Sequence, residues 1–336
     1  MKVLLYAEGL KTIGVSGLGK AIKHQMKALE DEKIEYTLNS KEDYDILHIN
    51  TWFIKSYFVA KKAKKKGKKI VYHAHSTEED YKNGFIFAKQ TSKLIKWWLI
   101  RCYSLGDVIV TPTIYSKNLL LGYKGLENKK IYAVSNGVEL DFFKKDEKCG
   151  EEFRKVYGYS NEDKVIIGIG LYIERKGIVD FVELAKRMPE YKFIWFGHSP
   201  LAAATKPVKK AVNTTLDNLI FAGHVDREMI RSAMNGCNLY LFPTFEETEG
   251  IPILEAIACE TDAIIRDIPI FDKWLEDGKN IYKAKDIDEF EIKIKKFLNG
   301  ELPSLTKKAL PVLSDRDQKN VGKQLKAIYE EVLNNK

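Results

Sequence analysis

Two glutamates, Glu247 and Glu255, have the types and spacing best suited to chemistry in this sequence. Glu247 lies in an acidic loop after a short apolar run, Leu239–Phe242, and Glu255 lies about one turn into a helix predicted to begin near Pro252. A helix start offers free backbone N–H groups and the positive end of a dipole, which suit a phosphate. A carboxylate on either side of that phosphate would suit a sugar nucleotide. The alternatives are an acidic surface loop and, less favoured because no His or Asp lies close by, a metal site.

A lysine occupies a comparable junction earlier in the chain. Lys176 follows an apolar run predicted to be a buried strand, Val165–Leu171, and precedes a helix predicted over Ile178–Met188. A cation at the start of a helix after a buried strand is well placed to bind the diphosphate of a nucleotide. We therefore predict that Lys176 contacts such a diphosphate.

Histidines follow one of the predicted strands. The strand over Lys69–His73 continues into His75, and ligands of parallel sheets bind at the C-terminal ends of the strands. His73 and His75 are therefore candidate ligand contacts. His48, inside the apolar run Tyr44–Ile49, is interpreted as a packed core histidine instead.

The N-terminal strand, Lys2–Ala7, leads into a glycine-rich loop with Gly14, Gly17 and Gly19, and a helix follows. Strand, glycine loop and helix are the opening of a doubly wound α/β domain. The loop lacks the G-x-G-x-x-G pattern, so a tight turn between helix and strand is at least as good an interpretation as a dinucleotide site.

Strands and helices alternate along the chain, which predicts an α/β fold. A chain of 336 residues exceeds one ordinary core and suits two domains. We predict a first domain over residues 1–148 and a second over 149–315. The hydrophilic stretch Lys144–Glu152 is predicted to be the linker.

The composition, with 45% hydrophobic and 30% charged residues, is typical of a folded globular protein. The net charge of +8 favours anionic partners, namely nucleotides, nucleic acid or an anionic membrane. Four scattered cysteines without a C-x-x-C pair indicate reduced thiols in a cytosolic protein. The apolar runs are too short for a signal peptide or a bilayer span, so we expect a cytoplasmic protein that can touch a membrane.

One predicted helix, Lys89–Leu105, combines a wide apolar face that includes Leu94 with an opposite basic face of Lys89, Lys93 and Lys96. Trp97 and Ile100 lie at or within the basic face, which is typical of an interfacial membrane helix. We expect this helix, with the lysines of Lys61–Lys69, to dock on an anionic membrane. Core packing of Trp97 and Ile100 is the alternative.

The glutamate pair resembles the E-G-F-G-x-x-x-x-E signature of the retaining GT-B glycosyltransferases of family 4. Here the signature is Glu247-Thr-Glu-Gly250-Ile-Pro-Ile-Leu-Glu255, in which Thr248 replaces the first glycine and Glu249 the aromatic residue. The resemblance implies two Rossmann-like domains facing a central cleft, with a last helix, residues 316–336, crossing back to the first domain. It also implies that Glu255 binds the nucleotide ribose and Glu247 the donor sugar, and that Gly250 and Ile251 donate backbone N–H groups to the diphosphate.

Other family segments match in part. In the family pattern G-R-x-x-x-x-K-G, Lys176 and Gly177 match, Leu171 replaces the arginine, and whether Arg175 supplies the missing charge stays open. The resemblance implies that Gly17 in the glycine loop approaches the donor and that backbone atoms of Val225 contact the base. A histidine that ends the strand would contact the donor sugar, with His75 preferred to His73. The implied catalytic residues are Glu247, His75 and Lys176.

Within the family the chain is most similar to glycosyl-diacylglycerol synthases of glycolipid and lipoteichoic acid anchor synthesis. The similar strings include HAHST, GLYxxRKG and EETEGI. The resemblance implies transfer of an α-hexose from UDP-glucose or UDP-galactose to a diacylglycerol-based lipid, with a monoglycosyl-diacylglycerol preferred as the acceptor. It implies no metal, no cofactor and no nucleic acid. The alternatives are a glycosyltransferase with a soluble or polysaccharide acceptor, a non-enzymatic GT-B subunit and, less favoured, a nicotinamide-linked oxidoreductase.

Overall fold

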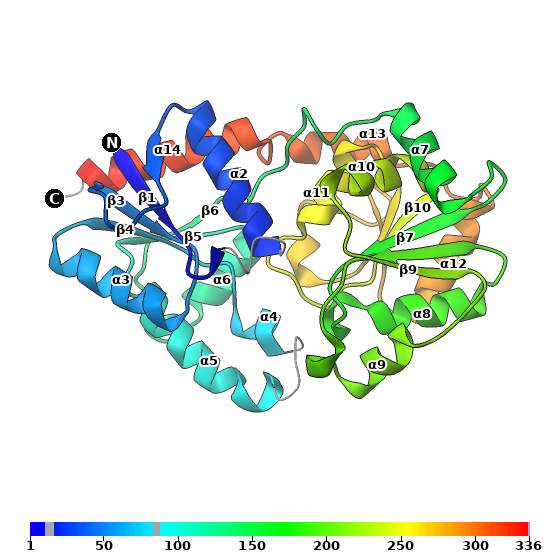
Figure 1. Ribbon diagram of the computed structural model, residues 1–336, viewed down its shortest axis with the longest axis horizontal. Helices are drawn as coiled ribbons and strands as arrows, with labels where there is room; N and C mark the ends of the chain where they lie inside the picture. The colour runs from blue at the N-terminus through cyan, green and yellow to red at the C-terminus, as the bar shows by residue number, and fades with distance from the viewer. Residues whose placement is uncertain (11–16, 83–87, 335–336) are drawn as a thin grey trace. The chain divides into compact units, whose positions relative to one another are not determined.

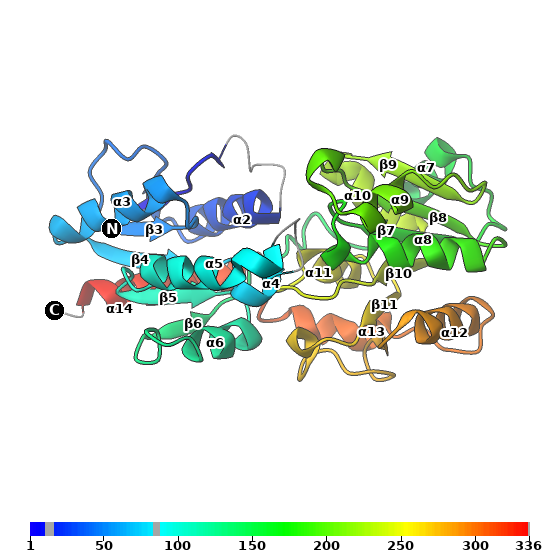
Figure 2. The ribbon, with the colours of Figure 1, turned by 90° about the horizontal axis from the view of Figure 1, so that it is seen from below.

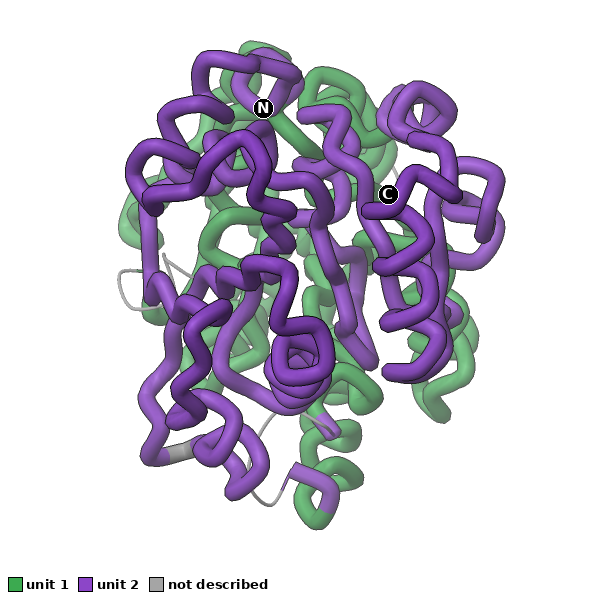
Figure 3. Tube along the Cα trace, turned by 90° about the vertical axis from the view of Figure 1, so that its right-hand side faces the viewer, with its two compact units in different colours: residues 1–81, 90–139, 315–336 green, residues 82–89, 140–314 purple. Residues whose placement is uncertain are grey.

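The computed structural model describes residues 1–10, 17–82 and 88–334 (Figure 1). Within them the chain forms two compact units, which Figure 3 shows in different colours. Unit 1 comprises residues 1–81, 90–139 and 315–336, and unit 2 comprises residues 82–89 and 140–314. Each unit contains one six-stranded parallel sheet flanked by helices, which confirms the predicted α/β fold class.

The sheet of unit 1 has the strand order β2-β1-β3-β4-β5-β6. Its central strands are short apolar runs buried along their whole length, as expected for a parallel sheet covered on both faces. The strands are β1 Lys2–Tyr6, β2 Glu35–Thr37, β3 Ile46–Ile49, β4 Lys69–His73, β5 Val108–Thr111 and β6 Ile131–Ala133.

Helices cover both faces of this sheet. One face packs against α2 (Gly17–Asp31) and α14 (Gln318–Asn334), whose side chains share a core with Val3 and Val71. The other face packs against α3 (Ile54–Lys65), α5 (Ala88–Tyr103) and α6 (Ile114–Leu121). A short helix, α4 (Glu78–Lys82), lies between β4 and α5 in the chain.

The segments through which the chain leaves and re-enters unit 1 are hydrogen-bonded to each other. The backbone N–H of Val138 donates to the carbonyl of Arg316 at 2.9 Å, and the N–H of Gln318 donates to the carbonyl of Val138 at 3.2 Å. These bonds fix the start of α14, so the C-terminal helix is an integral part of unit 1.

The sheet of unit 2 has the strand order β12-β11-β10-β7-β8-β9. Helices α8, α9 and α12 share a core with one face, and α7, α10 and α11 lie on the other (Figures 1 and 2). The strands are β7 Val165–Ile169, β8 Lys192–Phe196, β9 Leu219–Gly223, β10 Leu239–Phe242, β11 Ala263–Arg266 and β12 Tyr282–Ala284. The helices are α7 Glu147–Tyr157, α8 Ile178–Arg187, α9 Lys206–Val212, α10 Arg227–Gly236, α11 Ile251–Ala258, α12 Ile287–Leu298 and the short α13 Thr306–Ala309.

The prediction of a linker over Lys144–Glu152 is wrong for its second half. Helix α7 begins at Glu147, and the side chain of Asp146 accepts a hydrogen bond from the N–H of Cys149 as an N-cap. The helix packs closely on α10, where a Cβ on Gly150 would lie 2.6 Å from the carbonyl oxygen of Asn235. A hydrophilic helix therefore stands where composition alone predicts irregular chain.

Two side chains of α5 do not lie where its sequence pattern places them. Leu94, assigned to the apolar face, is 62% exposed, whereas Ile100, assigned to the basic face, packs on the core of unit 1. Trp97 is exposed as predicted. Among the described residues, no helix is both long and apolar enough to cross a bilayer.

Candidate active site

The loop after β10 and the start of α11 bring three glutamates into the interior of unit 2. Glu247 and Glu249 lie on the loop and Glu255 on the helix, and all three are at least nine-tenths buried. Gly250 is the N-cap of α11 with φ of +89°, a conformation that favours glycine, and Ile251 is the first helical residue. The sequence prediction of strand, acidic loop and helix is confirmed in this order.

Lys176 lies directly opposite this acidic loop. It ends a single 3₁₀ turn, Glu174–Lys176, after β7, and its Nζ forms an ion pair with Glu247. Buried carboxylates are stable only when paired or hydrogen-bonded, so this contact accounts for the burial of Glu247. The structure therefore brings together two of the three predicted catalytic residues.

The loops after β7 and β10 are locked to each other through their backbones. The N–H of Phe245 donates to the carbonyl of Arg175 at 2.8 Å. Gly177, with φ of +73°, is the N-cap of α8, and a Cβ there would lie 2.2 Å from the carbonyl oxygen of Pro243. Only glycine allows so close an approach of the two loops.

Arg175 contacts the same carboxylate as Lys176. Its Nη1 donates to the carbonyl of Glu246 at 2.7 Å and lies 3.6 Å from the Glu247 carboxylate. Leu171, which stands where the family has an arginine, is 36% exposed. Unit 2 thus presents two adjacent cations, Arg175 and Lys176, at the carboxyl edge of its sheet.

Two buried residues on the strands that carry or adjoin these loops were not predicted from the sequence to have polar contacts. The Tyr240 hydroxyl on β10 has its pKa raised well above the usual value by burial, then by the nearby Glu255 and Glu247 carboxylates. Arg266, at the end of β11, donates from Nε to the carbonyl of Pro243 at 2.9 Å. Both residues lie inside apolar runs, so the pattern indicates strands and gives no sign of polar contacts.

Arg266 also supports an exposed aromatic ring of the loop after β10. Its guanidinium forms an ion pair with Asp180 on α8 and lies 3.9 Å from the centroid of the Phe245 ring. The loop after β10 is therefore held by the buried guanidinium of Arg266 and by its backbone hydrogen bond to the loop after β7.

The remaining predicted donor contact of unit 2 lies at the end of β9. Gly223 closes this strand with φ of +71°, its carbonyl accepts from the N–H of Gly197 at 2.7 Å, and half-buried Val225 follows. The strand ends of β8 and β9 are thus joined at the same carboxyl edge of the sheet as Lys176 and Glu247.

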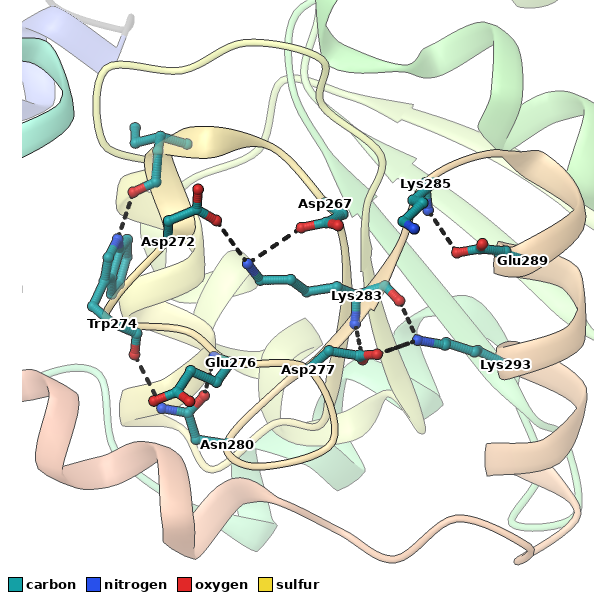
Figure 4. Close-up of polar contacts among 11 residues, drawn as sticks. Asp267, Asp272, Trp274, Glu276, Asp277, Asn280, Lys283, Lys285, Glu289 and Lys293 are labelled. Carbon is teal, nitrogen blue, oxygen red and sulfur yellow. Dashed lines mark hydrogen bonds and ion pairs between the residues drawn. The ribbon is translucent and has the colours of Figure 1, made fainter.

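A second charged cluster in unit 2 is structural (Figure 4). The buried ammonium of Lys283 lies 3.3 Å from Asp267 and 3.4 Å from Asp272, and Lys293 pairs with Asp277 at 2.8 Å. These contacts connect β12 and α12 with the loop after β11, so their charges are mutually satisfied.

Unit 1 places the predicted histidines in a buried group at the carboxyl ends of β3 and β4. His48 is fully buried, which confirms its interpretation as a core residue, and His73 is 2% exposed. His75 is half-buried, and its Nε2 lies 2.9 Å from Oδ1 of Asn50. Burial lowers the pKa of His48 and of His75 to about 3, so both rings are neutral at neutral pH.

The glycine loop of unit 1 is described only in part. Gly17 is the first residue of α2. Gly14 lies outside the described residues. The histidines also contact Gln25, Asn50 and Tyr329. The sequence did not predict these contacts, because they connect residues far apart in the chain.

Comparisons with known proteins agree with this arrangement. Residues 150–310 match the family model of glycosyl transferases group 1, and residues 32–142 match that of glycosyltransferase family 4. A processive diacylglycerol alpha-glucosyltransferase of Acholeplasma laidlawii is 37% identical over 99% of both chains. An alpha-galactosylglucosyldiacylglycerol synthase of Streptococcus pneumoniae is 24% identical over 82% of this chain and 74% of its own.

Solved structures show the same fold. Anabaena Alr3699/HepE, solved in complex with UDP-glucose, matches with a TM-score of 0.78 over 98% of this chain and all of its own, at 16% identity. Together with the two matched family models and the full-length relative, this shows that the chain belongs to glycosyltransferase family 4 and has the GT-B fold.

Proposed function

We propose that this protein is a retaining hexosyltransferase that moves an α-hexose from a UDP-sugar to diacylglycerol or to monoglycosyl-diacylglycerol. The observation that carries the proposal is the full-length relative, which is named a processive diacylglycerol alpha-glucosyltransferase. The buried Lys176–Glu247 pair beside Glu255 supports it, because these are the charged groups that a diphosphate sugar requires.

In the proposed reaction the bond between the anomeric carbon and the diphosphate oxygen breaks. The acceptor hydroxyl forms the new bond on the same face of the sugar, and its proton passes to the leaving diphosphate. Lys176 and the amides of Gly250 and Ile251 stabilise the charge that develops on that leaving group. Glu255 binds the ribose and Glu247 the sugar, with no resident metal or cofactor.

Four other residues have proposed contacts with the donor. Arg175 adds positive charge for the diphosphate, since it already lies beside Glu247. Val225 contacts the base through its backbone. Gly17 and His75 are the proposed contributions of unit 1, and His75 contacts the sugar as a neutral hydrogen-bonding ring.

The test of the proposal is a transfer assay with radiolabelled UDP-glucose and UDP-galactose. Each donor is offered with diacylglycerol, with monoglucosyl-diacylglycerol and, as a control acceptor, with a soluble oligosaccharide. The proposal predicts labelled glycolipid and little labelled oligosaccharide. Label that enters only the oligosaccharide would refute the lipid acceptor while retaining the enzyme class.

We further propose that unit 1 binds the inner face of the cell membrane through α3 and α5. The two helices are neighbours, because the Tyr57 and Trp98 rings lie 5.1 Å apart between centroids. Both helices expose large apolar side chains, namely Ile54, Phe58, Leu94 and Trp97. Helix α3 also exposes five lysines: Lys55, Lys61, Lys62, Lys64 and Lys65.

The apolar and the basic parts of this surface make separable contributions to membrane binding. Each lysine near an anionic surface contributes on the order of 1 kcal/mol to membrane binding, and salt weakens this contribution. The contribution from burial of apolar side chains does not depend on salt. Leu94→Ser with Trp97→Ala should therefore weaken sedimentation with anionic liposomes even at high salt. Ile292→Ser, which changes an exposed apolar residue of α12, is the control and should bind like the parent. Unchanged sedimentation of the double variant would refute this surface.

A further inference from the structure

Three histidine rings form a parallel column inside unit 1. The rings of His73 and His75 are 4.0 Å apart between centroids with planes 5° from parallel, and those of His48 and His73 are 5.3 Å apart with the same angle. His75 is the proposed sugar contact at one end of the column. At the other end, Tyr329 on α14 contacts His48.

Hydrogen bonds connect the column from end to end. The hydroxyl of Tyr329 lies 2.5 Å from Nδ1 of His48, and Nε2 of His48 lies 3.1 Å from Nδ1 of His73. Nε2 of Gln25, on α2, lies 2.9 Å from the same His73 nitrogen. Tyr329, His48, His73 and Gln25 are each at most 2% exposed, so these contacts lie in the interior of unit 1.

Counting the buried polar groups shows which atom donates in each of these hydrogen bonds. Burial lowers the pKa of His48 to about 3 and that of His73 well below its usual value, so each neutral ring has one donor and one acceptor. If Tyr329 donates to His48 and His48 to His73, the single lone pair of His73 Nδ1 is shared between His48 and Gln25. The N–H of His73 Nε2 is then left without a partner among the described residues.

The reverse order leaves more buried donors without partners. His48 Nδ1 would then donate to Tyr329, whose own hydroxyl hydrogen would have no acceptor. The amide of Gln25 would have to turn, placing its NH₂ group where its oxygen now lies without a partner. An unsatisfied buried donor is costly, so the first order is favoured.

We propose that Tyr329 is a positioning residue for sugar transfer: it sets the tautomer and ring plane of His48 and, through His73, the orientation of His75. The inference rests on the proposed function only in its last step, the role of His75. The hydrogen bonds hold His48 between Tyr329 and His73, and the stacking of His73 on His75 at 4.0 Å restrains the plane of the His75 ring. A change of the His48 tautomer at Tyr329 therefore reaches His75 through His73. The C-terminal helix thereby contributes to the site although it lies at the opposite end of the chain from β3.

The test uses the full-length protein with ¹⁵N-labelled histidine. The sequence contains six histidines, so side-chain nitrogen spectra can resolve each ring, and His48→Gln assigns the resonances of His48. The parent should show His48 and His73 as Nε2–H tautomers. Tyr329→Phe should mix the two tautomers of His48 and lower kcat about threefold to tenfold, the loss expected for one neutral hydrogen bond, with little change in the KM for the UDP-sugar.

Tyr103→Phe is the matched control. It also removes one buried hydroxyl from unit 1, which donates to the carbonyl of Ser76 at 2.8 Å and does not contact the column. A similar loss of thermal stability is expected in both variants, but the tautomers and their ratio should change only in Tyr329→Phe. An Nδ1–H tautomer of His48 in the parent, or a Tyr329→Phe spectrum like that of the parent, would overturn the proposal. Because the spectra need no lipid substrate, failure of lipid transfer would refute the proposed function and leave this result standing.

Discussion

Replacing Lys176 by alanine should lower both catalysis and the stability of unit 2. The ammonium of Lys176 pairs with Glu247, a carboxylate that is 7% exposed. Removing one partner of a buried pair costs ~3–5 kcal/mol when the other charge is left alone. Arg175 remains 3.6 Å from Glu247, so we expect a smaller loss of unfolding free energy, about 1–2 kcal/mol.

The catalytic loss should be larger than the loss of stability. A cation that stabilises the leaving diphosphate contributes more in the transition state than in the ground state, and its removal should lower kcat/KM by about two to four powers of ten. Urea unfolding and steady-state transfer assays on the same preparations measure the two effects. The double variant with Glu247→Gln should regain much of the stability and none of the activity, because the buried side chain at position 247 is then neutral and Arg175 keeps its hydrogen bond to the carbonyl of Glu246.

Lys186→Ala is the matched control for this prediction. Lys186 lies on the neighbouring helix α8, and its ion pair with Glu183, at 3.7 Å, is well exposed. Exposed pairs contribute ~0–1 kcal/mol, so this variant should retain activity and stability. A Lys176→Ala protein that behaves like Lys186→Ala in both assays would refute the role of Lys176.

Three further predictions concern the two glutamates, the buried His48 and the contact between the loops after β7 and β10. Glu255→Ala should lower the affinity for free UDP about tenfold or more in calorimetry, whereas Glu247→Ala should leave it nearly unchanged and reduce transfer; equal losses would contradict the assigned roles. The pKa of His48 is lowered to about 3 from an unfolded value of 6.5, so the unfolded chain binds the proton more tightly. Unfolding free energy should therefore fall as pH drops from 6.5 towards 3, by up to ~1.4 kcal/mol per pH unit for this ring, and His48→Gln should fall less steeply in urea titrations. Gly177→Ala brings a Cβ to 2.2 Å from a carbonyl oxygen, whereas Gly158→Ala, at a similar φ, meets no atom within 4 Å. Gly158→Ala should lose ~1–2 kcal/mol and Gly177→Ala clearly more, and equal urea midpoints would show that the two loops are not in tight contact.

The strands could be predicted from sequence because parallel strands are short apolar runs buried on both faces. Lys69–His73 and Leu239–Phe242 were predictable to the residue, and the helix Ile287–Leu298 likewise. Helix α7 was not, because its polar residues outnumber the few that pack, such as Phe153. On α5, the helical pattern gives a face only approximately, so Leu94 and Ile100 were exchanged between core and surface.

The candidate site could be predicted residue by residue but not as a set of contacts. Lys176 and Glu247 each stand at a recognisable junction of strand and helix, yet 71 positions separate the partners of their ion pair. Tyr329 and His48 are 281 positions apart. By itself each is an ordinary residue, His48 in an apolar run and Tyr329 on the buried face of an amphipathic helix. Only the packing of α14 on the sheet of unit 1 brings these two side chains together.

The lipid product and its anomeric configuration decide whether this protein is a retaining glycolipid synthase. Purified protein is incubated with UDP-glucose or UDP-galactose and with diacylglycerol or monoglucosyl-diacylglycerol in anionic liposomes, and the lipid product is examined by mass spectrometry and by proton NMR of its anomeric signal. We expect UDP and an α-linked glycolipid, neither of which Lys176→Ala should form at a comparable rate. A β-linked product would contradict retention, and the absence of any glycolipid product would contradict the proposed transfer itself.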